Sequence, residues 1–411
     1  MTKKPDAPAI RFKGFSDAWE QRKLSEMCGT FEYGLNAAAK EFDGKNKYIR
    51  ITDIDDASRE FLLSDLSSPD ICLDGMSKYL LSSGDIVFAR TGASVGKTYI
   101  YRENDGIVYF AGFLIRAKVN QDNDAEFVFQ STLSPSYEKY IRITSQRSGQ
   151  PGVNAQEYGE YDLFAPSKEE QQRIGHFLRG IDNLITLHQR KFEKLTNVKK
   201  SMLEKMFPQN GCSYPEIRFK GFTDAWEQRK VSELAEKTYG GGTPSTLNEA
   251  YWDGDIPWIQ SSDVVDGRLF GVVPRKRITQ YGLNNSATQL VPKNSIAIIT
   301  RVGVGKLAFM PYSYATSQDF LSLSKLNTEP LFTVYACYKK LQSELNAVQG
   351  TSIKGITKDE LLAKTVMVPQ YAEQQQIGAF FSQLDNLITL HQRELEKLQN
   401  IKKSMLEKMF V

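Results

Sequence analysis

The sequence predicts an α+β protein in which two mixed α/β domains are separated by two long antiparallel coiled-coil helices, arranged as an internal pseudo-twofold repeat. Three observations lead to this fold class. Two blocks of sequence occur twice, the second block of each pair has the periodicity of a long helix, and the segments between the blocks read as short strands and turns. The length of 411 residues also exceeds the usual size of one domain.

The duplication divides the chain into two halves. RFKGFSDAWEQRKLSE at 11–26 returns as RFKGFTDAWEQRKVSE at 218–233, with 14 of 16 positions identical. The block at 178–207 returns at 381–410, with 22 of 30 positions identical. The predicted domains are 1–166 with the first lead-in, a first spacer helix at 167–207, a linker at 208–217, 218–369 with the second lead-in, and a second spacer helix at 370–411.

The repeated blocks predict long helices that pack through one side. Apolar residues follow each other at alternating intervals of four and three, a period that forms a seam along one side of a helix. A helix of that size is about 55–60 Å long at about 1.5 Å per residue. The seam residues expected to pack between the helices are Ile181, Ile185, His188, Phe192, Leu195, Leu384, Ile388, His391, Leu395 and Leu398.

Several polar residues accompany this seam. His188 and His391 either set the register of the helix pair, as a buried polar residue does in a coiled coil, or form a two-histidine metal site. Lys199 and Lys402 interrupt the seam, and we expect their amines to reach solvent. Ser167, with a glutamate three residues later, predicts a capping box at the start of the first helix.

The segments between the repeats, 27–166 and 234–369, differ from each other and are called the first head and the second head. Their β-branched and aromatic runs, punctuated by Gly, Asn and Asp, predict strands at 47–55, 84–92, 98–119, 255–265 and 295–310. Helices are predicted at 127–141 and 332–345. A constant frame that carries two different heads is the layout expected of a protein with two different recognition tasks.

Composition limits the function classes. The chain is 25% charged and 41% hydrophobic, which excludes wholesale disorder, and no run is apolar enough for a membrane span or signal peptide, so we expect a cytoplasmic protein with no membrane contact. The net charge is +3, but the first head has 14 basic and 20 acidic residues, whereas the second has 14 and 11. Any binding to nucleic acid therefore does not depend on a uniformly basic surface.

Motifs for catalysis and for metal binding are absent from the sequence. The four cysteines are scattered, and neither HExxH nor GxSxG occurs, so no catalytic residue is expected. No metal site is expected either, because for the two histidines of the seam the register role is the preferred alternative. Gly92–Thr98 is one residue short of a phosphate-binding loop, and its counterpart lacks the hydroxyl after Lys306, which argues against a nucleotide-binding enzyme. Lys97 and Lys306 are then either residues of a glycine-containing turn or contacts to phosphates.

Taken together, these features resemble the specificity subunit of a type I restriction-modification enzyme. The resemblance covers essentially the whole chain. It is carried by the W-x-x-x-K-[LV]-x-E lead-ins at 19–26 and 226–233, the P-x-x-x-E-Q-Q-x-I helix starts at 166 and 369, and the duplicated helices. GGGTPSTLNEAYWDGDIPWIQSSDV in the second head is similar to the start of many target-recognition domains of that family.

The resemblance implies a non-catalytic reader of double-stranded DNA. Each head would be a target-recognition domain that reads one half of a bipartite asymmetric site, and the helices would separate the heads and dock partners. Two modification subunits would methylate adenine at N6 with S-adenosylmethionine, and restriction subunits would add ATP- and Mg-dependent translocation and cleavage. This chain itself would bind none of these cofactors. The alternative function is a non-catalytic coiled-coil adaptor with two protein-binding heads.

Candidate DNA-contacting residues are polar side chains at strand ends and glycine-rich turns, where strands and loops would supply base contacts. In the first head they are Arg50, Thr52, Arg90, Lys97, Tyr99, Gln146, Arg147 and Gln150. In the second head they are Thr243, Gln260, Ser261, Ser262, Arg301, Lys306, Gln318, Thr351 and Lys354.

Overall fold

The computed structural model describes residues 7–146, 149–209, 211–347 and 355–411. The chain forms two compact units, one made of Met1–Arg190 with His391–Val411 and the other of Lys191–Leu390. The boundary falls inside both long helices, so each unit contains one head, the beginning of one long helix and the end of the other. Among the described residues, no helix combines the length and apolar character needed to cross a membrane.

The first unit is a mixed α/β structure. Its strands are β1 (Glu20–Lys23), β2 (Cys28–Tyr33), β3 (Ala39–Glu41), β4 (Lys47–Ile49), β5 (Ser67–Pro69), β6 (Asp85–Ala89), β7 (Thr98–Ile100), β8 (Val108–Phe110), β9 (Leu114–Val119) and β10 (Asp162–Ala165). Its helices are α1 (Leu24–Met27), α2 (Ala125–Ser131), α3 (Pro135–Thr144), α4 (Ala155–Gly159) and the first part of α5 (Lys168–Lys205).

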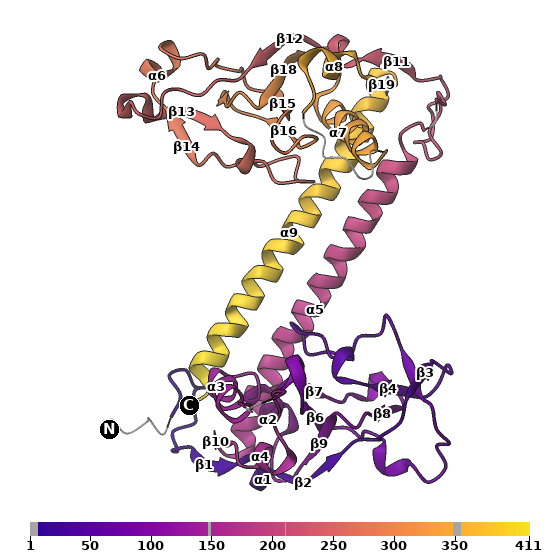
Figure 1. Ribbon diagram of the computed structural model, residues 1–411, viewed down its shortest axis with the longest axis vertical. Coiled ribbons are helices and arrows are strands. Elements are labelled where there is room, and N and C mark those ends of the chain that lie inside the picture. Colours follow the sequence, from indigo (N-terminus) through magenta and orange to yellow (C-terminus); the bar gives the residue numbers. More distant parts are fainter. Residues whose placement is uncertain (1–6, 147–148, 210, 348–354) are drawn as a thin grey trace. The chain divides into compact units, whose positions relative to one another are not determined.

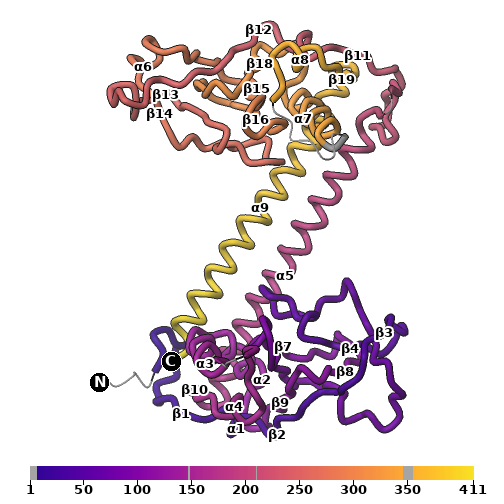
Figure 2. Tube along the Cα trace, viewed as in Figure 1, coloured from indigo at the N-terminus to yellow at the C-terminus, as the bar shows by residue number. Residues whose placement is uncertain are grey.

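The sheet of the first head has the strand order β2-β9-β6-β7, with every pair antiparallel (Figure 1). Helices α2 and α3 contribute Phe127 and Tyr137 to the core that also contains Phe88 of β6. The end of α9 lies beside the first head (Figure 2). The ring of Phe410, just after this helix, packs in the same core and lies 5.3 Å from the ring of Phe127. The C-terminal segment of the chain is thus part of the first unit.

The second unit is also a mixed α/β structure. Its strands are β11 (Glu227–Lys230), β12 (Ala235–Gly240), β13 (Trp252–Ile259), β14 (Lys276–Ile278), β15 (Ser295–Ile299), β16 (Leu307–Met310), β17 (Ala315–Thr316), β18 (Phe320–Leu326) and β19 (Thr365–Val368). Its helices are α6 (Gln280–Asn284), α7 (Pro330–Ala347), α8 (Lys358–Ala363) and the first part of α9 (Tyr371–Met409).

The two heads share one topology although their sequences differ. The order β12-β18-β15-β16 in the second head repeats β2-β9-β6-β7 of the first. A short parallel pair accompanies each sheet, β4 with β8 and β13 with β17. Each lead-in strand also pairs with the strand that precedes a long helix, β1 with β10 and β11 with β19. The mixed α/β prediction for both heads is therefore confirmed.

Several features of the predicted secondary structure need correction. The run at 98–119 contains three strands, β7, β8 and β9, and the run at 295–310 contains two, β15 and β16. The single helix predicted at 127–141 is two helices, because the side chain of Ser134 caps a new helix in which Pro135 takes the first turn. The strands predicted at 47–55 and 255–265 end early, at Ile49 and Ile259, and a 3₁₀ turn follows each of them.

The duplicated sequence makes the same contacts in both units. Arg11 binds Glu170 with two hydrogen bonds of 2.6 and 2.7 Å, and Arg218 binds Glu373 with two of 2.8 Å. Both glutamates are fully buried, so each arginine neutralises a charge that would otherwise be costly. Glu170, predicted to act in a helix cap, thus has both carboxylate oxygens on Arg11.

Close packing of α5 on α2 depends on a glycine. A Cβ atom added at Gly175 would lie 2.5 Å from Asp124 Oδ1 and 2.8 Å from the backbone nitrogen of Phe127. Gly378 has the same role in the second unit, since a Cβ there would lie 2.5 Å from Glu329 Oε2. Each head is therefore pressed against the start of its long helix at a point that tolerates no side chain.

We expect Gly175→Ala to destabilise the first unit by about 1–3 kcal/mol, because the backbone of α2 must move to admit a methyl group. Gly180→Ala is the matched control on the same helix, since a Cβ at Gly180 meets nothing within 4 Å. There, alanine should stabilise the helix by up to about 1 kcal/mol. Urea unfolding of both variants tests this, and equal effects would contradict the packing described.

Candidate nucleic-acid interface

Each head carries an equivalent turn directly after the strand of its parallel pair. In the first head β4 leads into the 3₁₀ turn Ile51–Asp53, and in the second β13 leads into Ser261–Asp263. In both turns an aspartate accepts a hydrogen bond from the backbone N–H that precedes the turn, at 2.9 Å from Arg50 and 3.1 Å from Gln260. Five of the predicted DNA-contacting residues, Arg50, Thr52, Gln260, Ser261 and Ser262, therefore lie on two equivalent turns.

Burial along these turns follows the same order in both heads. Tyr48 and Ile49 precede the first turn and are buried, as are their counterparts Trp258 and Ile259. The aspartates are 8% exposed in both heads. Sequence reasoning missed Asp53 and Asp263, although YIRITDI and WIQSSDV place an acidic residue between buried residues at the same position. That shared position was the available signal.

The two turns differ in the arginine that lies beside the aspartate. Asp53 binds the guanidinium of Arg50 through both oxygens, with Nε to Oδ2 at 2.8 Å and Nη2 to Oδ1 at 2.9 Å. These hydrogen bonds raise the pKa of Arg50. Asp263 instead has Arg275 nearby, with Nε 3.5 Å from Oδ1, and the side chain of Arg275 is 69% exposed. The same backbone thus presents different polar groups in the two heads.

A hairpin with glycines forms the second shared feature. The backbone N–H of Ala89 donates to the carbonyl of Lys97 in the first head, and Ile299 donates to Lys306 in the second. Arg90 lies over the ring of Tyr33, with its guanidinium carbon 5.1 Å from the centroid. Arg301, by contrast, is exposed.

The lysines of the two hairpins have different surroundings. Lys97 is buried, and its ammonium donates to the carbonyl of Ile54 at 3.1 Å and pairs with Asp56 at 2.6 Å. Lys97 therefore anchors the backbone that leaves the Asp53 turn. Lys306 is half-buried, and no hydrogen bond or ion pair joins its side-chain ammonium to another described residue. A phosphate contact for either lysine remains a prediction.

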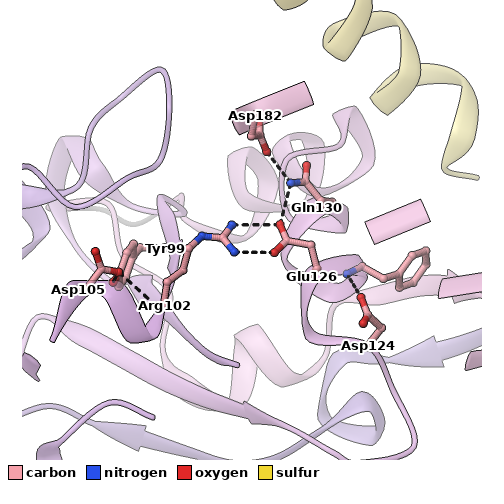
Figure 3. Close-up of polar contacts among 8 residues, drawn as sticks. Tyr99, Arg102, Asp105, Asp124, Glu126, Gln130 and Asp182 are labelled. Carbon is pink, nitrogen blue, oxygen red and sulfur yellow. Dashed lines mark hydrogen bonds and ion pairs between the residues drawn. The ribbon is translucent and has the colours of Figure 1, made fainter. Parts of the chain in front are cut away.

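The remaining predicted residues fall into three groups. Tyr99 is a core residue, 2% exposed, whose hydroxyl donates to Asp105 at 2.5 Å (Figure 3), and burial raises its pKa. Gln146 and Gln150 are exposed, and Thr243 donates to Gln318 at 2.6 Å on the surface of the second head. Arg147, Thr351 and Lys354 lie outside the described residues.

A polar network connects the first head to α5. Arg102 binds Glu126 with Nη1–Oε2 at 2.9 Å and Nη2–Oε1 at 3.3 Å, and Gln130 joins Glu126 to Asp182 at 3.2 and 2.7 Å (Figure 3). Asp182 also pairs with Lys402 of α9, with Nζ and Oδ1 2.5 Å apart. One carboxylate therefore joins the head to two helices within the first unit.

The second unit repeats this junction with a different donor. Asp385 accepts a hydrogen bond from the hydroxyl of Tyr335 at 2.6 Å and pairs with Lys199 at 2.5 Å. The side chains of Lys199 and Lys402 are 11% and 12% exposed. The expectation that these amines reach solvent is wrong, because an aspartate meets each of them.

The end of α9 runs antiparallel to the beginning of α5 in the first unit. Lys402 meets Asp182, and further along both helices His391 meets His188, with their Nδ1 atoms 3.1 Å apart. Such a contact is a hydrogen bond only when one Nδ1 carries a proton and the other does not. In the described part of the chain, no three His, Cys, Asp or Glu residues gather around a potential metal position.

The other seam residues are buried to different degrees. Ile181 and Leu384 are buried, while Ile185, Phe192, Leu195, Ile388, Leu395 and Leu398 are half-buried. Beside the seam, each helix exposes a leucine pair, Leu184 with Leu187 at 46% and 45%, and Leu387 with Leu390 at 44% and 51%. The same two leucines are therefore exposed in both repeats.

Comparison with known proteins identifies the family. Residues 16–197 and 223–400 each match the type I restriction modification DNA specificity domain. The chain belongs to this family. It is 23% identical over 404 residues to the putative type I restriction enzyme MjaX specificity subunit of Methanocaldococcus jannaschii, covering 94% of this chain and 92% of that one.

Two further relatives agree with this membership. The chain is 31% identical over 169 residues to the type I restriction enzyme EcoR124I/EcoR124II specificity subunit of Escherichia coli, covering 39% and 41% of the two chains. The crystal structure of the type I restriction-modification system S subunit from M. genitalium has a similar fold, with a TM-score of 0.69, 14% identity and coverage of 98% and 99%. The resemblance to type I specificity subunits is confirmed.

The anchoring role of Lys97 in this type I specificity subunit can be tested. Lys97→Met removes the donor to Ile54 and should lower the free energy of unfolding of the first unit by about 1–3 kcal/mol. Lys306→Met is the matched control in the second hairpin and should change stability by less than about 0.5 kcal/mol. Urea unfolding measures both, and a Lys97→Met variant as stable as the wild type would refute the anchor.

Proposed function

We propose that this chain is the DNA-binding subunit of a type I restriction-modification complex, with each head reading one half of a bipartite asymmetric site. The observation that carries the proposal is the pair of equivalent turns after β4 and β13, which have one backbone geometry but present Arg50 and Thr52 in one head and Gln260 and Ser262 in the other. These are residue types that contact base edges in the major groove. Two turns with the same backbone geometry but different polar side chains are suited to two different half-sites.

The reactions belong to partner subunits in this proposal. Two modification subunits bring S-adenosylmethionine and methylate adenine at N6, and restriction subunits bring ATP and Mg for translocation and cleavage. The specificity subunit is non-catalytic and binds none of these cofactors itself. We place the complex in the cytoplasm, where it meets double-stranded DNA. The weak phosphate attraction expected of the acidic first head is then supplemented by the partners.

The two long helices act as a spacer between the heads, as an antiparallel coiled coil with pseudo-twofold symmetry. Two observations support this arrangement. The ion pair of Asp182 with Lys402 recurs as Asp385 with Lys199. The residue before each lead-in also donates its backbone N–H to the end of a long helix, Ile10 to Lys408 and Ile217 to Lys205. The chain therefore follows a pattern that would be continuous if its two ends were joined.

The direct experiment is to co-express the chain with a type I modification subunit and to sequence the methylated DNA. We expect N6-methyladenine in a motif of two specific half-sites with an unspecified gap. A single continuous motif would argue against the proposal, as would the absence of sequence-specific methylation. The adaptor alternative predicts tight capture of protein partners with no sequence-dependent footprint on DNA.

The spacer role predicts how the motif responds to helix length. Seven residues inserted after Arg190 and seven after Arg393 keep the seam in register and lengthen each helix by about 10.5 Å. The unspecified gap should grow by about three base pairs at about 3.4 Å each, with both half-sites unchanged. Methylation sequencing checks this, and an unaltered gap would show that the helices do not set the spacing.

The exposed leucines predict where modification subunits dock. Leu187→Glu combined with Leu390→Glu should weaken binding of the modification subunit at least about tenfold, because charges replace apolar contacts at the centre of an interface. Asn183→Glu with Asn386→Glu is the control, since these exposed residues lie on the same turns. Calorimetric titration measures both, and equal affinities for the two variants would rule out this docking surface.

A further inference from the structure

The guanidinium of Arg50 is held in a fixed orientation with one edge free. Its Nε and Nη2 atoms donate to Asp53, which occupies one edge of the planar guanidinium. An arginine has five N–H donors, so three remain, two on Nη1 and one on Nη2. No described residue accepts a hydrogen bond from Nη1. The side chain is 34% exposed, so Arg50 reaches the surface of the first head.

The support beneath Arg50 is rigid. Asp53 also accepts the backbone N–H of Arg50 at 2.9 Å and the hydroxyl of Thr52 at 3.1 Å, so four hydrogen bonds fix its carboxylate. Ile49 before the turn and Ile54 after it are buried, and Lys97 binds the carbonyl of Ile54. Little side-chain entropy remains to be lost when the guanidinium meets a ligand.

The geometry of the free edge selects its ligand. Two parallel N–H groups match two acceptors side by side, and in the major groove of DNA guanine presents O6 and N7 in that arrangement. A phosphate would also accept such a pair of N–H groups. It carries no sequence information, however, so only a guanine contact would give the first head a base preference. The turn lies in a head whose excess of acidic residues gives no general attraction for phosphates.

We propose that Arg50, oriented by Asp53, reads one guanine in the half-site of the first head through its Nη1 and Nη2 edge. This inference rests on the proposed function and adds to it the base and the atoms of one contact. The second head has Gln260 at the equivalent position and leaves Asp263 to Arg275. The guanine contact of Arg50 is therefore particular to the first head and should affect one half-site only.

The test measures base preference at every position of the site. The assembled methyltransferase complex, with wild-type chain, Arg50→Gln or Arg50→Lys, is assayed on a set of duplexes that carry each single base-pair change across both half-sites. Neither variant keeps the planar pair of N–H donors that Asp53 orients, and Arg50→Lys keeps the charge. We expect the preference for guanine at one base pair to fall about 5- to 140-fold, with all other positions unchanged.

Arg22→Gln is the matched control. Arg22 also pairs with a nearby carboxylate, Glu20, at 2.7 Å, but it lies on β1 outside the head. Its loss should leave the preference at every base pair as in the wild type.

Other outcomes overturn the inference. It fails if the first half-site of the wild-type complex contains no guanine, or if the variants methylate all duplexes with wild-type preferences. It also fails if both variants lower methylation uniformly, which would indicate a phosphate contact or a purely structural ion pair. If the wild-type complex methylates no bipartite site at all, the proposed function fails before the base contact is reached. The two failures are therefore distinguishable.

Discussion

One partly buried carboxylate in each repeat joins the head to the helices. Asp182 accepts a hydrogen bond from Gln130 of the first head and pairs with Lys402 of α9, and Asp385 does the same with Tyr335 and Lys199. These aspartates are only 19% and 17% exposed, so removing one partner would leave a charge with little solvation. The orientation of a head on its helices depends on this junction.

The rest of the constant frame surrounds that junction and explains what the sequence duplicates. The buried Glu170 and Glu373 need Arg11 and Arg218, and the heads approach the long helices at glycines without room for a side chain. Only the donor from the head varies, as Gln130 or Tyr335. A head can therefore change most of its surface and still pack on the long helices in the same way, provided that it donates one hydrogen bond to Asp182 or Asp385.

The frame was predictable from sequence, whereas much of the interface was not. Identical blocks and a seam of 3.5-residue period identified the helices, which begin and end within two residues of the predicted bounds. The common topology of the heads left almost no identical residues, because it depends on the burial pattern and not on particular side chains. Asp53 and Asp263 were missed because the sequence around each of them predicts a continuous strand. Only the structure shows that each carboxylate accepts a hydrogen bond from the backbone and ends the strand.

Single candidate residues were harder to place for a related reason. A polar residue at a strand end looks the same in sequence whether its donor meets solvent or an internal acceptor. Tyr99 was a candidate for base contact, but its hydroxyl donates to Asp105 in the core. The ammonium of Lys97 donates to the carbonyl of Ile54 and pairs with Asp56. Arg50 differs, because Asp53 accepts hydrogen bonds only from its Nε and Nη2 atoms. The edge formed by Nη1 and Nη2 is held in place and still has free N–H donors.

The central claim is that two interchangeable heads on a duplicated frame each read one half-site. The most direct measurement replaces residues 27–166 with residues 234–369, so that both positions carry the second head, and then sequences DNA methylated by the complex. The account predicts a symmetric motif, made of two inverted copies of the second half-site. An unchanged asymmetric motif would contradict it, as would an assembled complex that no longer methylates any specific sequence.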